Sequence, residues 1–392
     1  MKVIRIGIVG IGNMGSAHAV NIYAEKVRGM KLTSVCDINT ERLQWAEAAF
    51  GSSVVYYDNY QSMLKSGKID AVIIATPHIL HPSIACDAFD EGLHVLIEKP
   101  SGIETVSVRK MNEKAKKSGR TFGIMFNQRT NPLYQALRNC VQEGKLGEIK
   151  RMVWIVNNWY RTQAYYDSGE WRGTWNSEGG GVLLNQCPHN LDIWQWIIGV
   201  PVRVRAFCKT GHYHNINVED DVTIYAEYDN HASAVFITST GEYPGTNRLE
   251  ISGTKGKAVL ENGELILSLL EKDERSICMN AQQGMPEEKV HTEIIRQAGP
   301  DSGHLGILQN FSNAILKGER LLAPGEEGIN GLMISNAAYL SEWTDEWATI
   351  PPDEEKFSTW LKQKQDREQV RERKMSGEKL SGSYAERWSV KW

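Results

Sequence analysis

A glycine-rich motif near the N-terminus could hold a diphosphate. Gly10-Ile11-Gly12-Asn13-Met14-Gly15 directly follows an apolar run at residues 3–9 and opens a helical pattern at residues 16–27. In such a strand–turn–helix, the first glycine permits a tight turn, the second lets a pyrophosphate approach the backbone, and the third lets helix and strand pack closely. The N–H groups at the helix start then bind the phosphates. The motif predicts a dinucleotide site that includes Gly10, Gly12, Asn13, Met14 and Gly15.

Asp37, at the end of the second apolar run, indicates which dinucleotide is bound. A carboxylate at this place accepts hydrogen bonds from the adenosine ribose hydroxyls and repels a 2′-phosphate. NAD is therefore favoured over NADP as the cofactor. Arg42, one helical turn into the next element, could in principle partner a phosphate, which leaves NADP as the less favoured alternative.

A lysine and a histidine could carry proton chemistry. Lys99 follows the apolar run 95–97, at the carboxyl end of a predicted parallel strand, where doubly wound sheets bind ligands. Its ammonium can hydrogen-bond a substrate oxygen, and a positive nicotinamide nearby would lower its pKa. His189 lies four residues after Asn185 in a helix predicted over residues 182–198, so the two share one face. Imidazole suits a general base that removes the proton of an alcohol as the alcohol is oxidised at neutral pH. The alternatives are a surface lysine and a structural histidine.

Residues 157–175, here named the aromatic segment, alternate rings with amide and guanidinium donors. Such a surface suits a polyhydroxylated ring, because the apolar face of the ring stacks while its hydroxyls bond in the plane. Trp, Tyr and Arg are also enriched at subunit interfaces, so the segment could contact a second copy as well or instead. The predicted substrate-binding residues are Asn157, Trp159, Arg161, Tyr165 and Trp175, together with Lys99, Asn185 and His189.

Composition and charge exclude several classes of partner. The formal net charge is −4, so there is no basic excess to neutralise nucleic-acid phosphates. The apolar runs span a few residues, far below the ~20 that cross a bilayer. Six scattered cysteines are typical of reduced thiols and predict a cytoplasmic protein. The pairs His78/His81 and His212/His214 lack neighbours at zinc-ligand spacing, so no metal is expected.

The elements that must position these residues fall into two groups. Short apolar runs alternate with helical patterns through residues 2–126, which predicts an α/β, doubly wound parallel sheet of the Rossmann type over residues 1–128. Strands without intervening helices follow, which predicts an α+β domain with a large, mostly antiparallel open sheet over residues 129–350. Residues 351–392 form a charged extension, expected to be a solvated helix or loose tail unless its terminal aromatics fold back or reach a neighbouring subunit.

Three further motifs resemble the glucose–fructose oxidoreductase / inositol dehydrogenase / MocA (Gfo/Idh/MocA) family over roughly residues 2–350. They are Glu98-Lys99-Pro100, Ala75-Thr76-Pro77 with His81, and the Gly-Gly-Gly to His-x-x-Asp stretch at residues 179–192. The resemblance implies that Lys99 and His189 bind the hydroxyl that is oxidised, and that one of them removes its proton as hydride passes to C4 of NAD. It further implies a homodimer or homotetramer. The implied cofactor-binding residues are Thr76, Pro77, His81, Glu98, Lys99 and Pro100. Asn127 is expected beside the same site because it comes just after the last strand of the first domain.

Asn185 departs from the family pattern, in which many members carry Asp. An amide can orient a hydroxyl but cannot stabilise an imidazolium by charge. The departure therefore favours Lys99 over His189 as the base. The leading hypothesis is an NAD-dependent oxidoreductase that acts on a secondary hydroxyl of a sugar, inositol or sugar derivative. The alternatives are an NAD-dependent glycosidase that works by transient oxidation and elimination, and a catalytically silent NAD-binding protein.

Overall fold

The computed structural model describes residues 3–297, 299 and 301–370. These residues form two compact units that are interleaved along the chain. The domain boundaries predicted at residues 128 and 350 stay a prediction, and the terminal aromatics of the extension lie outside the described residues. The first unit holds residues 3–130, Ser177–Gly179 and Ser302–Leu332, and the second holds Asn131–Asn176, Gly180–Asp301 and residues 333–370.

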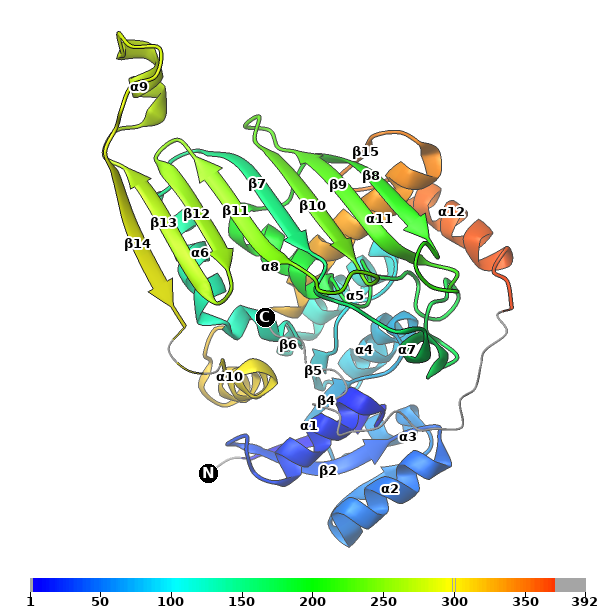
Figure 1. The fold of residues 1–392 in the computed structure, drawn as a ribbon. Helices are drawn as coiled ribbons and strands as arrows, with labels where there is room; N and C mark the ends of the chain where they lie inside the picture. Colours follow the sequence, from blue (N-terminus) through cyan, green and yellow to red (C-terminus); the bar gives the residue numbers. More distant parts are fainter. Residues whose placement is uncertain (1–2, 298, 300, 371–392) are drawn as a thin grey trace. The chain divides into compact units, whose positions relative to one another are not determined.

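A six-stranded parallel sheet in the order β3-β2-β1-β4-β5-β6 forms the centre of the first unit (Figure 1). β-branched residues such as Ile6, Ile8 and Ile73 are fully buried in it, as expected of strands covered on both faces. The order reverses between β1 and β4, and doubly wound sheets bind ligands outside the carboxyl ends of the strands at this point. The strands are β1 (Ile4–Val9), β2 (Met30–Cys36), β3 (Val55–Tyr57), β4 (Ala71–Ile74), β5 (His94–Ile97) and β6 (Phe122–Ile124).

Among the described residues, five helices of the first unit connect these strands, and a sixth, α10, comes from a later part of the chain. Helix α1 begins at Asn13 and ends at Tyr23, earlier at both ends than the predicted helix at residues 16–27, because the backbone turns helical directly after Gly12. The helices are α1 (Asn13–Tyr23), α2 (Thr40–Phe50), α3 (Tyr60–Leu64), α4 (His81–Asp90), α5 (Thr105–Ser118) and α10 (Gly303–Lys317), with short 3₁₀ turns η1 (Gly51–Ser53), η2 (His78–Leu80), η3 (Asn127–Thr130) and η4 (Gly325–Glu327).

The second unit is built on a nine-stranded sheet in the order β14-β13-β12-β11-β7-β10-β9-β8-β15. Its neighbouring strands are antiparallel except for β10 and β7. Helices α6 and α8 lie against one face of it (Figure 1). The elements are α6 (Pro132–Gln142), β7 (Ile149–Val156), α7 (Gln163–Asp167), α8 (Pro188–Ile198), β8 (Arg203–Thr210), β9 (Glu219–Glu227), β10 (Ser233–Ser239), β11 (Asn247–Gly253), β12 (Gly256–Glu261), β13 (Glu264–Leu270), α9 (Glu274–Asn280), β14 (Val290–Arg296), α11 (Gly328–Thr344), β15 (Ala348–Thr349) and α12 (Glu354–Asp366).

This architecture confirms the predicted fold class: a Rossmann-type parallel sheet followed by a large, mostly antiparallel one. All six cysteines are free thiols, and Cys278 is exposed. In the described part of the chain, no helix combines the length and apolar character that crossing a bilayer requires. The predicted homodimer or homotetramer stays a prediction.

Candidate active site

The glycine motif forms a tight turn between β1 and α1. Gly10 has φ +85°, and a Cβ there would lie 2.6 Å from the Ala75 carbonyl oxygen. A Cβ on Gly15 would lie 1.8 Å from the Gly10 carbonyl oxygen, so helix and strand meet only because the residue is glycine. A Cβ on Gly12, by contrast, would meet no atom within 4 Å. Gly12 caps α1 without a side-chain hydrogen bond, so the start of the helix is open to an anion.

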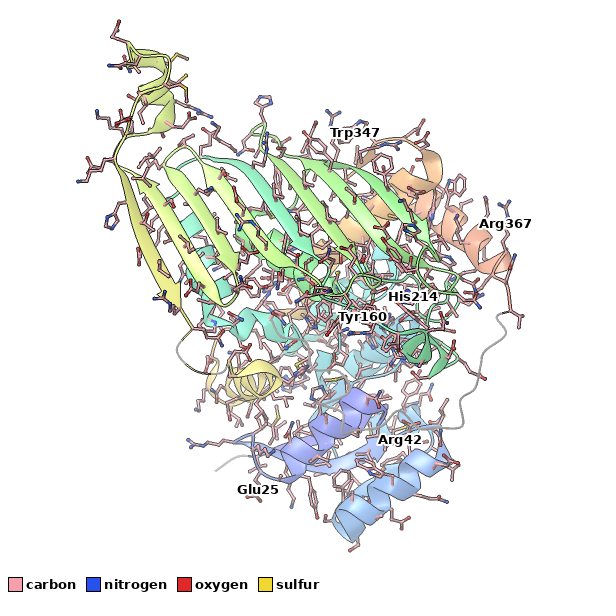
Figure 2. All side chains as sticks on the ribbon, in the orientation of Figure 1. Glu25, Arg42, Tyr160, His214, Trp347 and Arg367 are labelled. Atoms are coloured by element: carbon pink, nitrogen blue, oxygen red, sulfur yellow. The ribbon has the colours of Figure 1, made fainter. Side chains whose placement is uncertain are left out.

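Two side chains hold the edge of this turn. The Asp37 carboxylate accepts hydrogen bonds from the backbone N–H of Ile11 at 2.8 Å and of Asn39 at 2.9 Å. Arg42 donates from Nε to the Ile11 carbonyl oxygen at 2.7 Å. Arg42 (Figure 2) thus ties α2 to the turn, while Asp37 is oriented by backbone donors and keeps further lone pairs for ribose hydroxyls.

Two buried polar atoms at the carboxyl edge of the parallel sheet point to a ligand. The Thr76 hydroxyl, after β4, and the Asn127 carbonyl oxygen Oδ1, after β6, have no hydrogen-bond partner within the described residues. Buried polar groups are normally satisfied, so these atoms fit a site that a bound dinucleotide completes. Together with the open space at Gly12, they show that the residues present fit NAD. Asn13, Met14 and Pro77 adjoin these groups along the chain.

Glu98 is the buried member of the Glu98-Lys99-Pro100 motif after β5. Its carboxylate lies 2.7 Å from His18 Nε2 and accepts a hydrogen bond from the Lys99 backbone N–H at 3.2 Å. Burial works to raise the pKa of Glu98, but the hydrogen bond from His18 and the positive charges nearby outweigh it and bring the pKa to about 2. The His304 ring lies 5.8 Å from that of His18, and burial lowers the pKa of His304 to about 4. Lys99 is therefore anchored beside a fixed carboxylate. Neither His18 nor His304 is among the residues predicted from the sequence.

His81 joins two of the predicted cofactor motifs. Its ring is fully buried, with Nδ1 2.8 Å from the Pro100 carbonyl oxygen and Nε2 2.8 Å from the Thr76 carbonyl oxygen. Burial lowers the pKa of the ring. Because both nitrogens are engaged, His81 shapes the site through the backbone of Thr76 and Pro100. Its predicted contact with the cofactor stays a prediction.

In the second unit, the residues before α8 differ from the predicted helix over residues 182–198. Residues 180–187, here named the pre-helix turn, are not helical, and α8 begins at Pro188. The buried Glu219 carboxylate accepts hydrogen bonds from the backbone N–H of Gly181 at 2.9 Å and of Leu183 at 3.0 Å, which hold the turn in another conformation. Proline at the first helical position then starts the helix. Asn185 consequently lies in the turn, half-buried, whereas His189 is a buried residue of the first turn of α8.

The aromatic segment is tied to the residues around Asn185 and His189. The Trp159 indole N–H donates to Asn190 Oδ1 at 3.0 Å, and Gln186 donates to the Tyr165 hydroxyl at 3.2 Å. The Arg161 guanidinium lies over both rings, with its carbon 5.8 Å from the Trp159 ring centre and 5.1 Å from that of Tyr165. Tyr160 marks this segment in Figure 2. The structure thus brings three predicted substrate-binding residues, Trp159, Arg161 and Tyr165, into one cluster beside the pre-helix turn.

Two other predicted substrate-binding residues, Asn157 and Trp175, contact neighbouring parts of the second unit. The Asn157 amide donates to Glu242 and its oxygen accepts from the Thr246 backbone N–H. Trp175 is 4% exposed, and its ring centre lies 5.3 Å from that of Tyr339. Lys99 belongs to the first unit and His189 to the second, so their convergence on one hydroxyl stays a prediction.

The Glu219 carboxyl should make stability depend on pH. Burial raises its pKa from 4.5 to about 7, against the hydrogen bonds from Leu183, Tyr339 and Gly181. A pKa raised by folding means that the folded state holds the proton more tightly, so the stabilisation is present below pH 4.5 and lost as pH rises to about 7. Glu219→Gln cannot ionise. Relative to the wild type, we expect its free energy of unfolding to improve by up to about 3 kcal/mol across this window. Urea unfolding at several pH values tests this, and a constant difference would contradict it.

Comparisons with known proteins agree with this arrangement. The family model described as "Oxidoreductase family, NAD-binding Rossmann fold" matches residues 4–126, and that of the "GFO/IDH/MocA C-terminal domain" matches residues 134–259. Over 348 residues, the chain is 24% identical to the oxidoreductase YrbE of Bacillus subtilis (strain 168), covering 87% of this chain and 94% of that protein. It is 22% identical to inositol 2-dehydrogenase of Rhizobium meliloti (strain 1021), covering 86% and 96%.

A solved structure shows the same likeness across both sheets. The WlbA dehydrogenase of Bordetella pertussis, in complex with NADH and UDP-GlcNAcA, is 27% identical with a TM-score of 0.74, covering 90% of this chain and 100% of that one. The two family models together span most of the described chain. The matched ranges include the turn at Gly10, the Glu98-Lys99-Pro100 sequence and the pre-helix turn. This protein belongs to the Gfo/Idh/MocA family of oxidoreductases, with an NAD-binding Rossmann fold in its first part.

Proposed function

We propose that the protein is an NAD-dependent dehydrogenase that oxidises a secondary hydroxyl of a sugar, an inositol or a sugar derivative. The observation that carries the proposal is the position of Lys99 at the carboxyl end of β5, on the same sheet edge as the dinucleotide turn, with its backbone N–H on the Glu98 carboxylate. The related proteins act in this range of chemistry: one is an inositol 2-dehydrogenase, and another binds NADH and UDP-GlcNAcA.

In this mechanism the chain's own groups handle the hydroxyl and its proton. The Lys99 ammonium donates a hydrogen bond to the hydroxyl oxygen, and the His189 imidazole contacts the same hydroxyl. Oxidation to a ketone removes one hydride from carbon and one proton from oxygen. With Lys99 as the ammonium, the His189 imidazole takes the proton; Lys99 can take it instead only as the neutral amine. Bound NAD supplies the hydride acceptor. Asn185 orients the substrate by hydrogen bonds, and the rings of Trp159 and Tyr165 stack against its apolar face.

A substrate panel tests the proposal. Purified protein is mixed with NAD and, in turn, with inositols, pyranoses, glycosides and nucleotide-linked sugars, and the absorbance of NADH is followed. We expect net NADH to accumulate with at least one neutral or acidic sugar or polyol. Release of an aglycone without net NADH would instead identify a glycosidase that recycles its cofactor. No turnover with any polyol, despite NAD binding, would contradict both enzymatic functions.

The choice of NAD over NADP should depend on the Asp37 carboxylate. Asp37→Ser removes the charge that repels a 2′-phosphate and keeps a small acceptor for the Ile11 N–H, to which Asp37 is bonded at 2.8 Å. We expect the ratio of kcat/KM for NAD to that for NADP to fall by about tenfold or more. Glu41→Ser, another acidic residue nearby at the start of α2, serves as the control and should leave the ratio unchanged. An unaltered ratio in the Asp37 variant would remove the carboxylate from cofactor selection.

A further inference from the structure

The chain after α12 returns to the end of the aromatic segment. The Glu368 carboxylate accepts hydrogen bonds from the backbone N–H of Trp175 at 2.7 Å and of Asn176 at 3.3 Å, and it also accepts from the Asn176 side-chain amide. Gln365 adds two more bonds, because its carbonyl accepts from Asn176 Nδ2 at 3.1 Å and its side chain donates to the Trp175 carbonyl at 3.2 Å. Arg367 marks this end of α12 in Figure 2. The backbone of residues 175–176 is thus held on both its donor and acceptor sides.

The same helix holds the Trp175 side chain through a row of rings. The Trp175 ring meets Tyr339 and Trp343 edge-on, with centres 5.3 and 5.5 Å apart. Trp343 stacks on Phe357 of α12 at 5.4 Å, and Phe357 is buried. The Tyr339 hydroxyl donates to Glu219 at 2.8 Å. Because Glu219 binds the backbone of the pre-helix turn, α12 reaches the residues before His189 through a chain of contacts over Trp343, Tyr339 and Glu219. Its contact with the aromatic segment is direct, through the bond from Gln365 to the Trp175 carbonyl.

The contacts of Glu368 and Gln365 with residues 175–176, here named the clamp, lie where the chain passes between the two units. Trp175 and Asn176 are the last residues of the second unit before the chain passes to Ser177–Gly179 of the first and returns at Gly180. The aromatic segment therefore has one end at this point, and the pre-helix turn begins just after it. A carboxylate that accepts backbone N–H groups makes stronger hydrogen bonds than a neutral acceptor. We propose that Glu368 is a positioning residue for substrate, which fixes the aromatic segment by binding the backbone of Trp175 and Asn176.

This inference rests on the proposed function of the aromatic segment, and it concerns the part of the chain predicted to be a charged extension. Residues 354–369 thus contribute to the substrate site, because Glu368 and Gln365 bind the last residue of the aromatic segment and the residue after it. Asn217 adds a further contact, since its amide donates to the Gln369 carbonyl at 2.9 Å and its backbone N–H donates to the Gly173 carbonyl at 3.0 Å. Glu368 acts through Trp175 and touches neither cofactor nor reacting atoms in this scheme.

Amide hydrogen exchange tests the clamp without any need for turnover. In full-length Glu368→Ala, we expect exchange at the Trp175 and Asn176 amides to accelerate by about tenfold or more, because each loses its acceptor. Asp366→Ala is the matched control, because Asp366 is a nearby acidic residue at the end of α12 whose exposed carboxylate pairs with Lys362 at 2.7 Å. The control should leave exchange at 175–176 at the wild-type rate. Unchanged exchange in Glu368→Ala would overturn the clamp.

Kinetics then test whether the clamp positions substrate. For a substrate found in the panel, we expect Glu368→Ala to raise KM by about tenfold and to leave kcat and NAD affinity within about twofold. Glu368→Gln, which keeps one acceptor oxygen, should recover part of the loss. A thermal melt shows whether the variant is folded. Faster exchange with an unchanged KM would overturn the positioning role while leaving the proposed function intact, and an inactive wild type would refute the proposed function while the exchange result stands.

Discussion

Lys99→Ala and His189→Ala should each lower kcat by about 10²–10⁴-fold while leaving NAD affinity within about threefold of the wild type. The reason is that both groups are proposed to contact the hydroxyl that reacts, whereas the dinucleotide turn at Gly10 and Gly12 is separate in sequence from both. NAD affinity is measured by fluorescence titration, and kcat by NADH formation. Lys110→Ala and His231→Ala, which alter exposed residues of the same types, are the controls and should retain full turnover.

The pH dependence of the same variants shows which group removes the proton. If His189 is the base, the wild-type kcat/KM falls on the acid side, because protonation of the imidazole removes the base. That acid limb should vanish in His189→Ala and persist in Lys99→Ala. The reverse result would assign the base to Lys99. Near-normal turnover in either alanine variant would remove that residue from the mechanism.

The sequence predicts the fold well where burial leaves a continuous apolar pattern. Strands β1, β4 and β5 are buried on both faces and carry β-branched residues, so their short apolar runs identify them. Strand β3 has three half-buried residues that include two tyrosines, and edge strand β14 is largely exposed with the polar sequence VHTEIIR. Neither strand has the alternation of apolar and polar residues that would identify it from the sequence, because an edge or half-covered strand has fewer side chains to bury.

The sites are harder to predict because their partners come from distant elements. Helical periodicity continues from Val182 through the pre-helix turn, yet Glu219, thirty-odd residues later, captures two of its N–H groups and stops a helix from forming. Pro188 is the one local signal of the true helix start. His18 gives no signal at all, since its bond to Glu98 joins residues that are 80 apart in the chain.

In the charged extension, composition predicts the helix but not its tertiary contacts. A run of Lys, Glu, Asp and Gln predicts a solvated helix, and most of α12 is indeed polar. Phe357 and Leu361 are nevertheless buried, and Glu368 is bound to backbone N–H groups of Trp175 and Asn176. Mean composition cannot distinguish the one carboxylate with such partners from the exposed ones around it, because the difference lies in the tertiary contact.

Gly12→Ala should abolish tight NAD binding in a protein that is otherwise folded. A Cβ on Gly12 meets no protein atom within 4 Å, and its φ of −67° suits alanine, so the loss of stability should be about 1 kcal/mol or less. The methyl group would, however, occupy the space through which a pyrophosphate approaches the start of α1. We expect the Kd for NAD to rise by about a hundredfold, which corresponds to about 2.7 kcal/mol.

Two comparison variants separate this steric effect from a general loss of folding. Gly284→Ala adds a methyl group at another glycine with nothing within 4 Å, and it should change neither NAD affinity nor the melting temperature. Gly15→Ala places its Cβ 1.8 Å from the Gly10 carbonyl oxygen, so it should lower NAD affinity and thermal stability together. Calorimetric titration and thermal melts of the three variants give both quantities. If Gly12→Ala bound NAD as tightly as the wild type, the phosphates could not pass along the start of α1, and the dinucleotide site would have to be placed elsewhere on the sheet edge.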